Sequence, residues 1–252
     1  MPQIFKPVAN NQARFGVVVF GLAPWVIMLS LAMFSRSPFN TKVEVPRNQP
    51  VPFSHRHHAW ELGIDCRYCH TGVEKGPFAG IPGTETCMSC HSQIWTNSPL
   101  LEPIRESYET GTPIRWTRVN KVPEFVFFNH SIHISRGINC NVCHGAVEQM
   151  PITWKGKAFE MSWCLDCHRD PAKHLYADAP DTEHPGSMTP RQQVFELYWK
   201  IQNGEELTDR EKSLARGEEY SPTPQEYADG QKLVNLYGVK VAELSDCTTC
   251  HR

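Results

Sequence analysis

The sequence lacks an excess of charge of either sign, because 25 lysines and arginines nearly balance 27 aspartates and glutamates. A formal net charge of -2 gives no electrostatic reason to expect a nucleic acid as a partner. The polar part of the chain also has few long stretches of regular hydrophobic periodicity. Finally, the chain has no cysteine outside one short repeated pattern, so the cysteines become the main source of information.

All 10 cysteines fall in five Cys-x-x-Cys-His motifs, numbered 1 to 5 from the N-terminus. They are motif 1 (Cys66, Cys69, His70), motif 2 (Cys87, Cys90, His91), motif 3 (Cys140, Cys143, His144), motif 4 (Cys164, Cys167, His168) and motif 5 (Cys247, Cys250, His251). In c-type haem attachment the two thiols bind the porphyrin and the imidazole becomes the proximal iron ligand. The sequence therefore predicts five haem c groups, whose macrocycles supply much of the apolar core.

Two other uses of cysteine explain the motifs less well. Structural zinc sites usually have several residues between the cysteine pair and the histidine pair, whereas each histidine in this chain directly follows its cysteine. A disulfide framework would not need a histidine after every pair. Haem attachment is therefore the preferred interpretation.

Residues 16–34 form an apolar segment without a charged side chain. About 20 such residues cross a hydrocarbon core of ~30 Å, so we expect a transmembrane anchor. Lys6 and Arg14 precede the segment and no acidic residue does, which favours a cytoplasmic N-terminus. The haem-binding part is then expected on the periplasmic, outer face of a bacterial cytoplasmic (inner) membrane. A cleaved signal peptide ending near residues 30–32 is the alternative.

The segments that begin at Phe53 and Phe128 repeat one another, each with a His-x-x-His pair followed by two haem motifs. Side chains three residues apart on a helical turn share a face. We therefore expect His55 with His58, and His130 with His133, to be the distal ligands of four haem irons. The alternative is that these are ordinary surface histidines. The pattern predicts two dihaem modules and one terminal haem.

The fifth iron needs a distal ligand that the histidine pairs do not supply. Met150 or Met161 of the second module is the predicted ligand, although methionine also commonly fills gaps in cores. His174, His184 and Met188 are possible substitutes. A Met/His haem has a higher potential than its bis-His neighbours, which would make it an exit point for electrons.

The predicted fold class is a haem-packed multihaem cytochrome c with short helices, much irregular structure and one N-terminal transmembrane helix. The expected parts are a cytoplasmic N-terminus (1–15), the anchor (16–34), a tether (35–52), dihaem module 1 (53–91), an intermodule segment (92–127), dihaem module 2 (128–170), a partly helical spacer (171–245) and the terminal haem site (246–252). Capping-box patterns at Thr208 and Thr223, with the segment 190–203, predict three helices in the spacer.

Several stretches of the chain carry a family resemblance: residues 92–95, 98–103, 128–133, 163–169 and 247–252. They resemble the pentahaem cytochrome c subunit of alternative complex III, a quinol:electron acceptor oxidoreductase. The likeness is close over residues 53–174 and extends in outline to the anchor and the last haem. Residues 175–240 have no counterpart that we can match.

The resemblance implies an electron-transfer subunit with no catalytic site of its own. In that family a membrane-embedded subunit oxidises quinol and an iron-sulfur protein accepts the electrons. The pentahaem subunit relays them to a monohaem cytochrome or another outer-side acceptor. The residues agree with this role, since no lysine replaces a proximal histidine and no cluster of ionisable residues suggests a substrate site.

Two other classes of protein fit parts of the pattern. A stand-alone multihaem quinol dehydrogenase also has a short anchor followed by several haems, and it oxidises quinol by itself. A multihaem reductase needs an open iron coordination site for its substrate. The histidines and methionines outside the motifs are numerous enough to close all five irons, which argues against a reductase.

Overall fold

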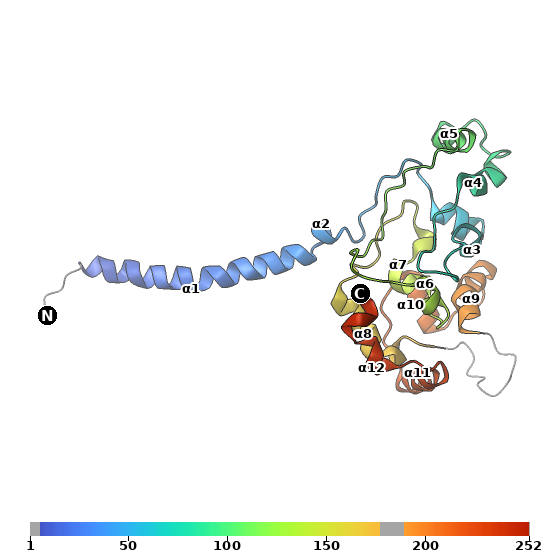
Figure 1. The fold of residues 1–252 in the computed structure, drawn as a ribbon. Coiled ribbons are helices and arrows are strands. Elements are labelled where there is room, and N and C mark those ends of the chain that lie inside the picture. Colours follow the sequence, from blue (N-terminus) through green and yellow to red (C-terminus); the bar gives the residue numbers. More distant parts are fainter. Residues whose placement is uncertain (1–5, 177–188, 252) are drawn as a thin grey trace. The chain divides into compact units, whose positions relative to one another are not determined.

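The computed structural model describes residues 6–176 and 189–251, which belong to two compact units (Figure 1). The first unit is Met1–Val45 and the second is Pro46–Arg252. The first unit contains α1 (Pro7–Arg36) and α2 (Pro38–Thr41).

Helix α1 is the one helix of the described residues that is long and apolar enough to cross a membrane. Its 30 residues correspond to about 45 Å at the rise of an α-helix. The helix is therefore longer than the predicted segment 16–34 and extends it at both ends. Pro24 lies inside the helix, where membrane spans tolerate proline. The apolar side chains of α1 are exposed, as a lipid-facing helix requires.

The segment after α1, part of the predicted tether of residues 35–52, contains the short helix α2. Helix α2 forms a single turn that begins at a proline and ends at Lys42 in the left-handed conformation. Farther along, in the second unit, Val51 is 3% exposed and packs with Leu101 and Ile104. The end of the predicted tether is thus part of a hydrophobic cluster.

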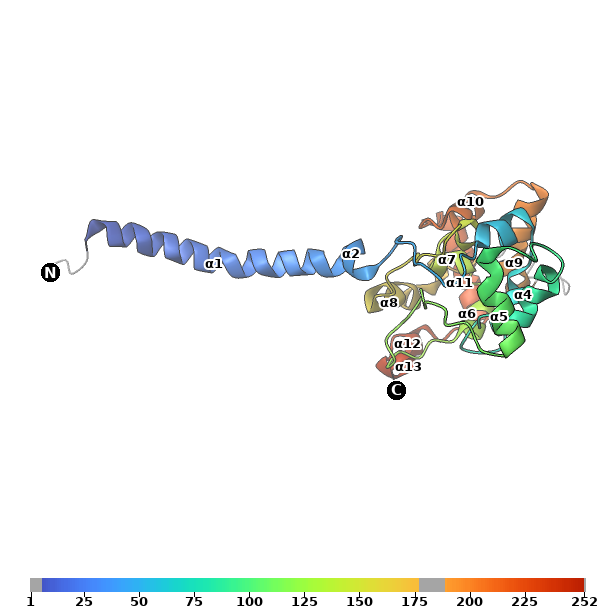
Figure 2. The same cartoon turned by 90° about the horizontal axis from the view of Figure 1, so that it is seen from above.

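The second unit consists of short helices joined by irregular segments (Figures 1 and 2). In chain order they are η1 (Arg56–Glu61), α3 (Cys66–Cys69), α4 (Thr84–His91), η2 (Pro99–Leu101), α5 (Glu102–Thr110), α6 (His130–Ile134), α7 (Cys140–His144), η3 (Val147–Gln149), α8 (Met161–Arg169), η4 (Pro171–Lys173), α9 (Pro190–Asn203), α10 (Asp209–Arg216), α11 (Pro224–Leu236), α12 (Val241–Leu244) and α13 (Cys247–Cys250). Element η1 is a π-helix and the other η elements are 3-10 helices. This helical and irregular architecture confirms that part of the predicted fold class.

Each haem motif lies on a helical turn: motifs 1 to 5 lie on α3, α4, α7, α8 and α13. Because the two cysteines of a motif are three residues apart, a helical turn brings them to the same side. The turns of motifs 1 and 3 begin with matching caps. The side chain of Asp65 accepts from the backbone N–H of Arg67, and that of Asn139 accepts from Asn141.

Buried apolar side chains form small clusters beside the motif cysteines. In one cluster, Cys66 and Cys140 pack against Val73, Ile134, Val194 and Phe195. In the other, Cys87 and Met88 pack against Val51, Leu101 and Ile104. The two clusters therefore place motif cysteines in contact with the buried side chains of the protein.

The three helices predicted in the spacer are present as α9, α10 and α11. Capping boxes at Thr208 and Thr223 start α10 and α11 as expected. A third capping box at Thr189 starts α9, and the Thr-x-x-Gln pattern would have revealed it. Helix α9 contacts α6 and α10 contacts α7, so part of this region covers the second module.

Candidate haem sites

The structure places each histidine of a His-x-x-His pair opposite the histidine of a haem motif. The ring centroids are 6.3 Å apart for His55 and His70, 6.1 Å for His58 and His91, 6.3 Å for His130 and His144, and 6.2 Å for His133 and His168. With metal–nitrogen bonds of ~2.0–2.1 Å, and nitrogens about 1.1 Å from the ring centre, one shared metal needs centroids about 6.2 Å apart. All four pairs therefore have the spacing that an iron ligated by both rings requires.

Three of the four ring pairs are close to parallel. The interplanar angle is 4° for His130 with His144, and 10° and 20° for the pairs that contain His55 and His133. The pair of His58 with His91 is more open, at 64°. Rotation of an imidazole about its metal–nitrogen bond accommodates either angle, so each pair fits a bis-His iron.

Hydrogen bonds hold the Nδ1 atoms of most of these histidines. The oxygen partners are Thr153 Oγ1 for His55 (3.1 Å), Ser54 O for His58 (2.9 Å), Gly80 O for His70 (2.6 Å), Ile94 O for His91 (3.1 Å), Pro77 O for His130 (2.6 Å), Asn129 O for His133 (2.8 Å) and Leu244 O for His168 (3.2 Å). An Nδ1–H that donates to oxygen leaves the Nε2 lone pair available for a metal. The hydrogen bonds thus prepare these rings for ligation through Nε2.

A phenylalanine packs against each His-x-x-His pair in the same way. Phe53 lies edge-on to His55 at 5.0 Å and stacks on His58 at 4.5 Å. Phe128 lies edge-on to His130 at 4.8 Å and stacks on His133 at 4.6 Å. The sequence repeat is therefore accompanied by matching ring geometry.

The first copy of the repeat has one more residue before its cysteine, and the π-helix η1 accommodates that residue. The N–H of Ile64 donates to His58 O at 3.0 Å, and the N–H of Ile138 donates to His133 O at 3.1 Å. These equivalent hydrogen bonds close turns that differ in length by one residue. Gly63 and Gly137 have positive φ at the same place in both turns. The wider turn keeps both histidines in position, as π-turns at functional sites often do.

Burial keeps two of the facing histidines, His55 and His144, neutral. The pKa of His55 is lowered to about 4 by burial first, and then by the neighbouring His70, His58 and His144. The pKa of His144 is lowered to about 4 by burial, His130 and His70. Both rings are neutral at neutral pH, which is the form that binds a metal.

Motif 3 is the most enclosed motif because α9 and α10 cover it. Asn139 Nδ2 donates to Val194 O at 2.9 Å, and Asn141 Nδ2 donates to Leu214 O at 3.1 Å. The hydroxyl of Tyr198 donates to the side-chain oxygens of both asparagines. These residues were not predicted from the sequence, although an Asn before a helical turn is a capping signal.

Motif 5 lacks a facing histidine among the described residues. His251 Nδ1 donates to Phe125 O at 3.1 Å, and the N–H of Phe127 donates to Cys250 O at 2.8 Å. The ring of His251 has the ring of Phe125 as its neighbour, at 5.7 Å. The ring contacts of the described residues therefore do not identify a second ligand for an iron at motif 5.

The two candidate methionines have different surroundings. Met150 is 1% exposed, and its methyl carbon lies 3.7 Å from where a Cβ on Gly145 would be. Met161 is 65% exposed at the start of α8, one turn before Cys164. The Nε2 of His174, one of the possible substitutes, is buried and has no hydrogen-bond partner in the described part of the chain. His184 and Met188 lie outside the described residues.

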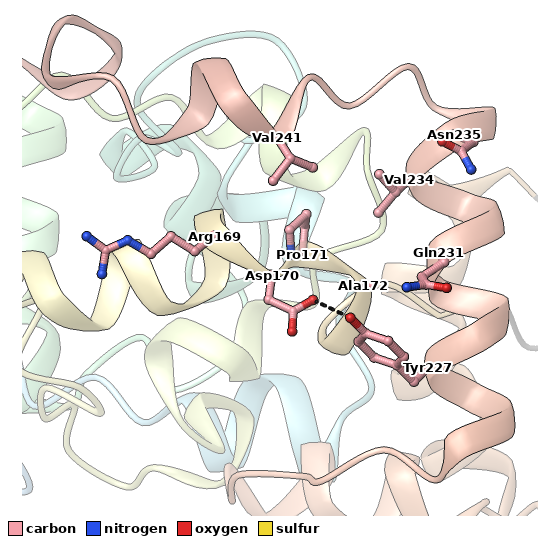
Figure 3. A pocket seen from close by; sticks show the side chains of 9 residues that line it. All are labelled: Arg169, Asp170, Pro171, Ala172, Tyr227, Gln231, Val234, Asn235 and Val241. Carbon is pink, nitrogen blue, oxygen red and sulfur yellow. Dashed lines mark hydrogen bonds between the residues drawn. The ribbon is translucent and has the colours of Figure 1, made fainter.

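A cavity of about 310 Å³ lies beside motif 4 (Figure 3). Its walls are Arg169, Asp170, Pro171 and Ala172 on one side, and Tyr227, Gln231, Val234, Asn235 and Val241 on the other. The hydroxyl of Tyr227 donates to Asp170 Oδ1 at 3.2 Å across it. Lys173 also pairs with Asp170, so this carboxylate is already satisfied.

The structure has short helices and small hydrophobic clusters, and its histidines face one another at the spacing that a shared metal ion requires. These are the features of a multihaem cytochrome c. No family model matches the chain. The chain is similar to the multihaem cytochrome c subunit of menaquinone reductase from Nitratidesulfovibrio vulgaris. The two are 30% identical over 183 residues, which cover 72% of this chain and 79% of the relative. The chain belongs to this family of multihaem cytochrome c subunits.

Proposed function

We propose that the chain is the electron-relay subunit of a quinone-linked membrane complex and that it binds five haem c groups. The observation that carries the proposal is the set of four histidine pairs with centroids 6.1 to 6.3 Å apart. Bound haem c iron supplies reversible one-electron oxidation and reduction. The protein's contribution is to hold, orient and shield the groups.

The proposed roles of the residues follow from this geometry. The ten motif cysteines bind the porphyrins, and His70, His91, His144, His168 and His251 are the proximal ligands. His55, His58, His130 and His133 are the distal ligands of motifs 1, 2, 3 and 4 in that order. This assignment is supported by which ring faces which, and it groups the motifs into two dihaem modules.

Met161 is the better candidate for the fifth distal ligand. Met150 is enclosed beside Gly145, next to histidines that already face one another, and there it serves to fill the core. Met161 shares a helix face with Cys164. The pKa of Cys164 is raised by burial and then by the nearby Cys250 of motif 5. These positions support a role for Met161 at the motif 5 iron.

The partners that we propose are an iron-sulfur protein, a quinone-reactive membrane subunit and a monohaem cytochrome. The resemblance to alternative complex III suggests these partners, and the relative is itself named as a subunit of a menaquinone reductase. Helix α1 would anchor the chain in the inner membrane, with the haem unit on the periplasmic face. No catalytic site is assigned to this chain, since quinone chemistry belongs to a partner.

The direction of net electron flow separates the two kinds of complex. In alternative complex III electrons leave quinol and reach an acceptor outside the membrane. The name of the relative instead describes reduction of menaquinone. We favour the quinol-oxidising direction on the resemblance of residues 53–174 and propose to test it directly.

The test is to purify the chain from its native membrane in mild detergent and to identify the co-purifying subunits by mass spectrometry. Rapid mixing with menaquinol should then reduce the haems, whereas menaquinone should not oxidise reduced haems at a comparable rate. The opposite result would place the chain in a menaquinone reductase. A chain that is purified alone and still oxidises quinol would be a stand-alone dehydrogenase.

A further inference from the structure

The spatial order of the haem motifs differs from their order along the chain. Because haem binding by all five motifs is part of the proposed function, this inference rests on it. The hydrogen bonds, ring contacts and clusters of the described residues join the motifs as a series of neighbours.

Motifs 1 and 2 are in direct contact. Tyr68, between the cysteines of motif 1, and Ser89, between those of motif 2, share a hydrogen bond of 2.9 Å. Their distal histidines lie on one turn, with Phe53 against both rings. The pKa of Cys87 is raised by burial and then by the nearby Cys69. Motif 2 is therefore a neighbour of motif 1.

Motif 1 also contacts motif 3. Cys66 and Cys140 pack against the same hydrophobic cluster. The distal histidines cross between the modules, since His130 Nδ1 donates to Pro77 O at 2.6 Å and His55 Nδ1 contacts Thr153 Oγ1 at 3.1 Å. Each module thus positions a ligand of the other.

Motifs 3 and 4 are joined through the second histidine pair. His130 faces motif 3 and His133 faces motif 4 from the same helical turn, with Phe128 against both rings. This arrangement repeats that of motifs 1 and 2.

Motif 5 adjoins motif 4. His168 Nδ1 donates at 3.2 Å to the carbonyl of Leu244, which shortly precedes Cys247. Helix α12 contacts α8, which carries motif 4. Figures 1 and 2 show α4, with motif 2, and the C-terminal end, with motif 5, on opposite sides of the second unit.

Motifs 2 and 5, at the two ends of the series, are also the motifs that have an exposed cysteine. Of the ten cysteines, Cys90 of motif 2 and Cys247 of motif 5 are exposed, whereas the other eight are partly buried. We expect a haem joined to an exposed cysteine to have a porphyrin edge that lies nearer to solvent than those of the other haems. The enclosed motif 3 has α9 and α10 over it instead.

We propose that the motifs form an unbranched series in the order 2, 1, 3, 4, 5, and that redox partners approach motifs 2 and 5 only. An electron that a quinone-linked partner gives to one end leaves to an acceptor at the other. The protein then returns to its starting redox state. Motif 2, which follows motif 1 along the chain, is therefore the end of the series, and motif 1 is the member of module 1 that adjoins module 2.

The direct test is to locate the five irons in the holoprotein by anomalous scattering at the iron edge. The iron bound by His70 should have the irons of His91 and His144 as its nearest neighbours. The irons of His91 and His251 should each have one near neighbour. A branched arrangement, or an end iron between two others, would overturn the order. Fewer than five covalent haems by mass would instead overturn the proposed function.

A second test compares how open the motifs are. H58A and H130A should each convert one haem to high spin, at motifs 2 and 3 respectively. A dissolved gadolinium chelate should enhance the relaxation of the high-spin signal several-fold more in H58A than in H130A. Equal enhancement in the two variants would contradict an open end at motif 2. Full occupancy of five haems in both variants shows that the comparison is valid.

Discussion

His130 and His144 face one another with ring centroids 6.3 Å apart and planes only 4° from parallel. Direct stacking of two aromatic rings would allow a closer approach, and a hydrogen bond between them would need nitrogen atoms within about 3 Å. The spacing is instead the one that an ion ligated by both rings would require. The same relationship recurs between His55 and His70, at 6.3 Å and 10°.

The intact chain should carry five covalent haems. Each motif supplies two cysteines on one helical turn, so each is expected to form two thioethers. Mass spectrometry of the intact protein should show the peptide mass plus five haems, and acid-acetone should extract none. Replacing Cys87 and Cys90 together with Ser should lower the count by one. Extractable haem in the unmodified protein would refute covalent binding.

Single removal of a distal histidine should convert one haem to high spin without releasing it. The variants are H55A, H58A, H130A and H133A, and the measurement is electron paramagnetic resonance of the oxidised protein. The matched control is H57A, because His57 is exposed and pairs with Glu61 at 3.0 Å. H57A should leave the spectrum unchanged. A spectrum unaffected in all four variants would make these histidines ordinary surface residues.

Met161→Ala and Met150→Ala should have different effects. M161A should lower the potential of one haem, because it removes the thioether ligand that raises that potential. M150A should leave the potentials unchanged but destabilise the fold by ~2–5 kcal/mol, as for other buried truncations. Redox titration and denaturant unfolding separate the two results. If M150A alone shifts a potential, the ligand assignment is reversed.

Gly217→Ala should destabilise the protein more than Gly204→Ala. Both glycines follow a helix with positive φ, so alanine costs ~1–2 kcal/mol at either position. A Cβ on Gly217 would lie 2.7 Å from the backbone nitrogen of Ala146, whereas one on Gly204 meets nothing within 4 Å. Overpacking should therefore add ~1–3 kcal/mol in G217A. Equal losses of unfolding free energy in urea would show that the end of α10 does not pack tightly against the loop after motif 3.

Local patterns predicted much of this molecule. The shared helical turn of each His-x-x-His pair and the capping boxes at Thr208 and Thr223 depend on residues close together in the sequence. The anchor helix was also predicted, although its ends were not. Such elements are set by backbone hydrogen bonds and side-chain periodicity within a few turns.

Long-range contacts could not be predicted in the same way. Nothing near Gly145 in the sequence indicates that Gly217 packs on it, or that Tyr198 binds the asparagines of motif 3. The spatial order of the motifs depends on similar contacts, such as that between Tyr68 and Ser89. These pairings arise from packing between distant segments, which periodicity does not encode.

The cover over motif 3 has a consequence for biogenesis. If haem is attached to Cys140 and Cys143 as proposed, the attachment machinery must reach them, yet α9 and α10 cover this motif and come later in the chain. We expect haem to be attached while these helices are still unfolded, so that they pack over motif 3 only after it has bound haem. In a pulse-chase experiment, attachment should precede protease resistance of residues 190–216, and the reverse order would contradict this sequence of events. Maturation would then depend on the order of events, because a chain in which α9 and α10 pack over motif 3 too early could no longer bind haem at that motif.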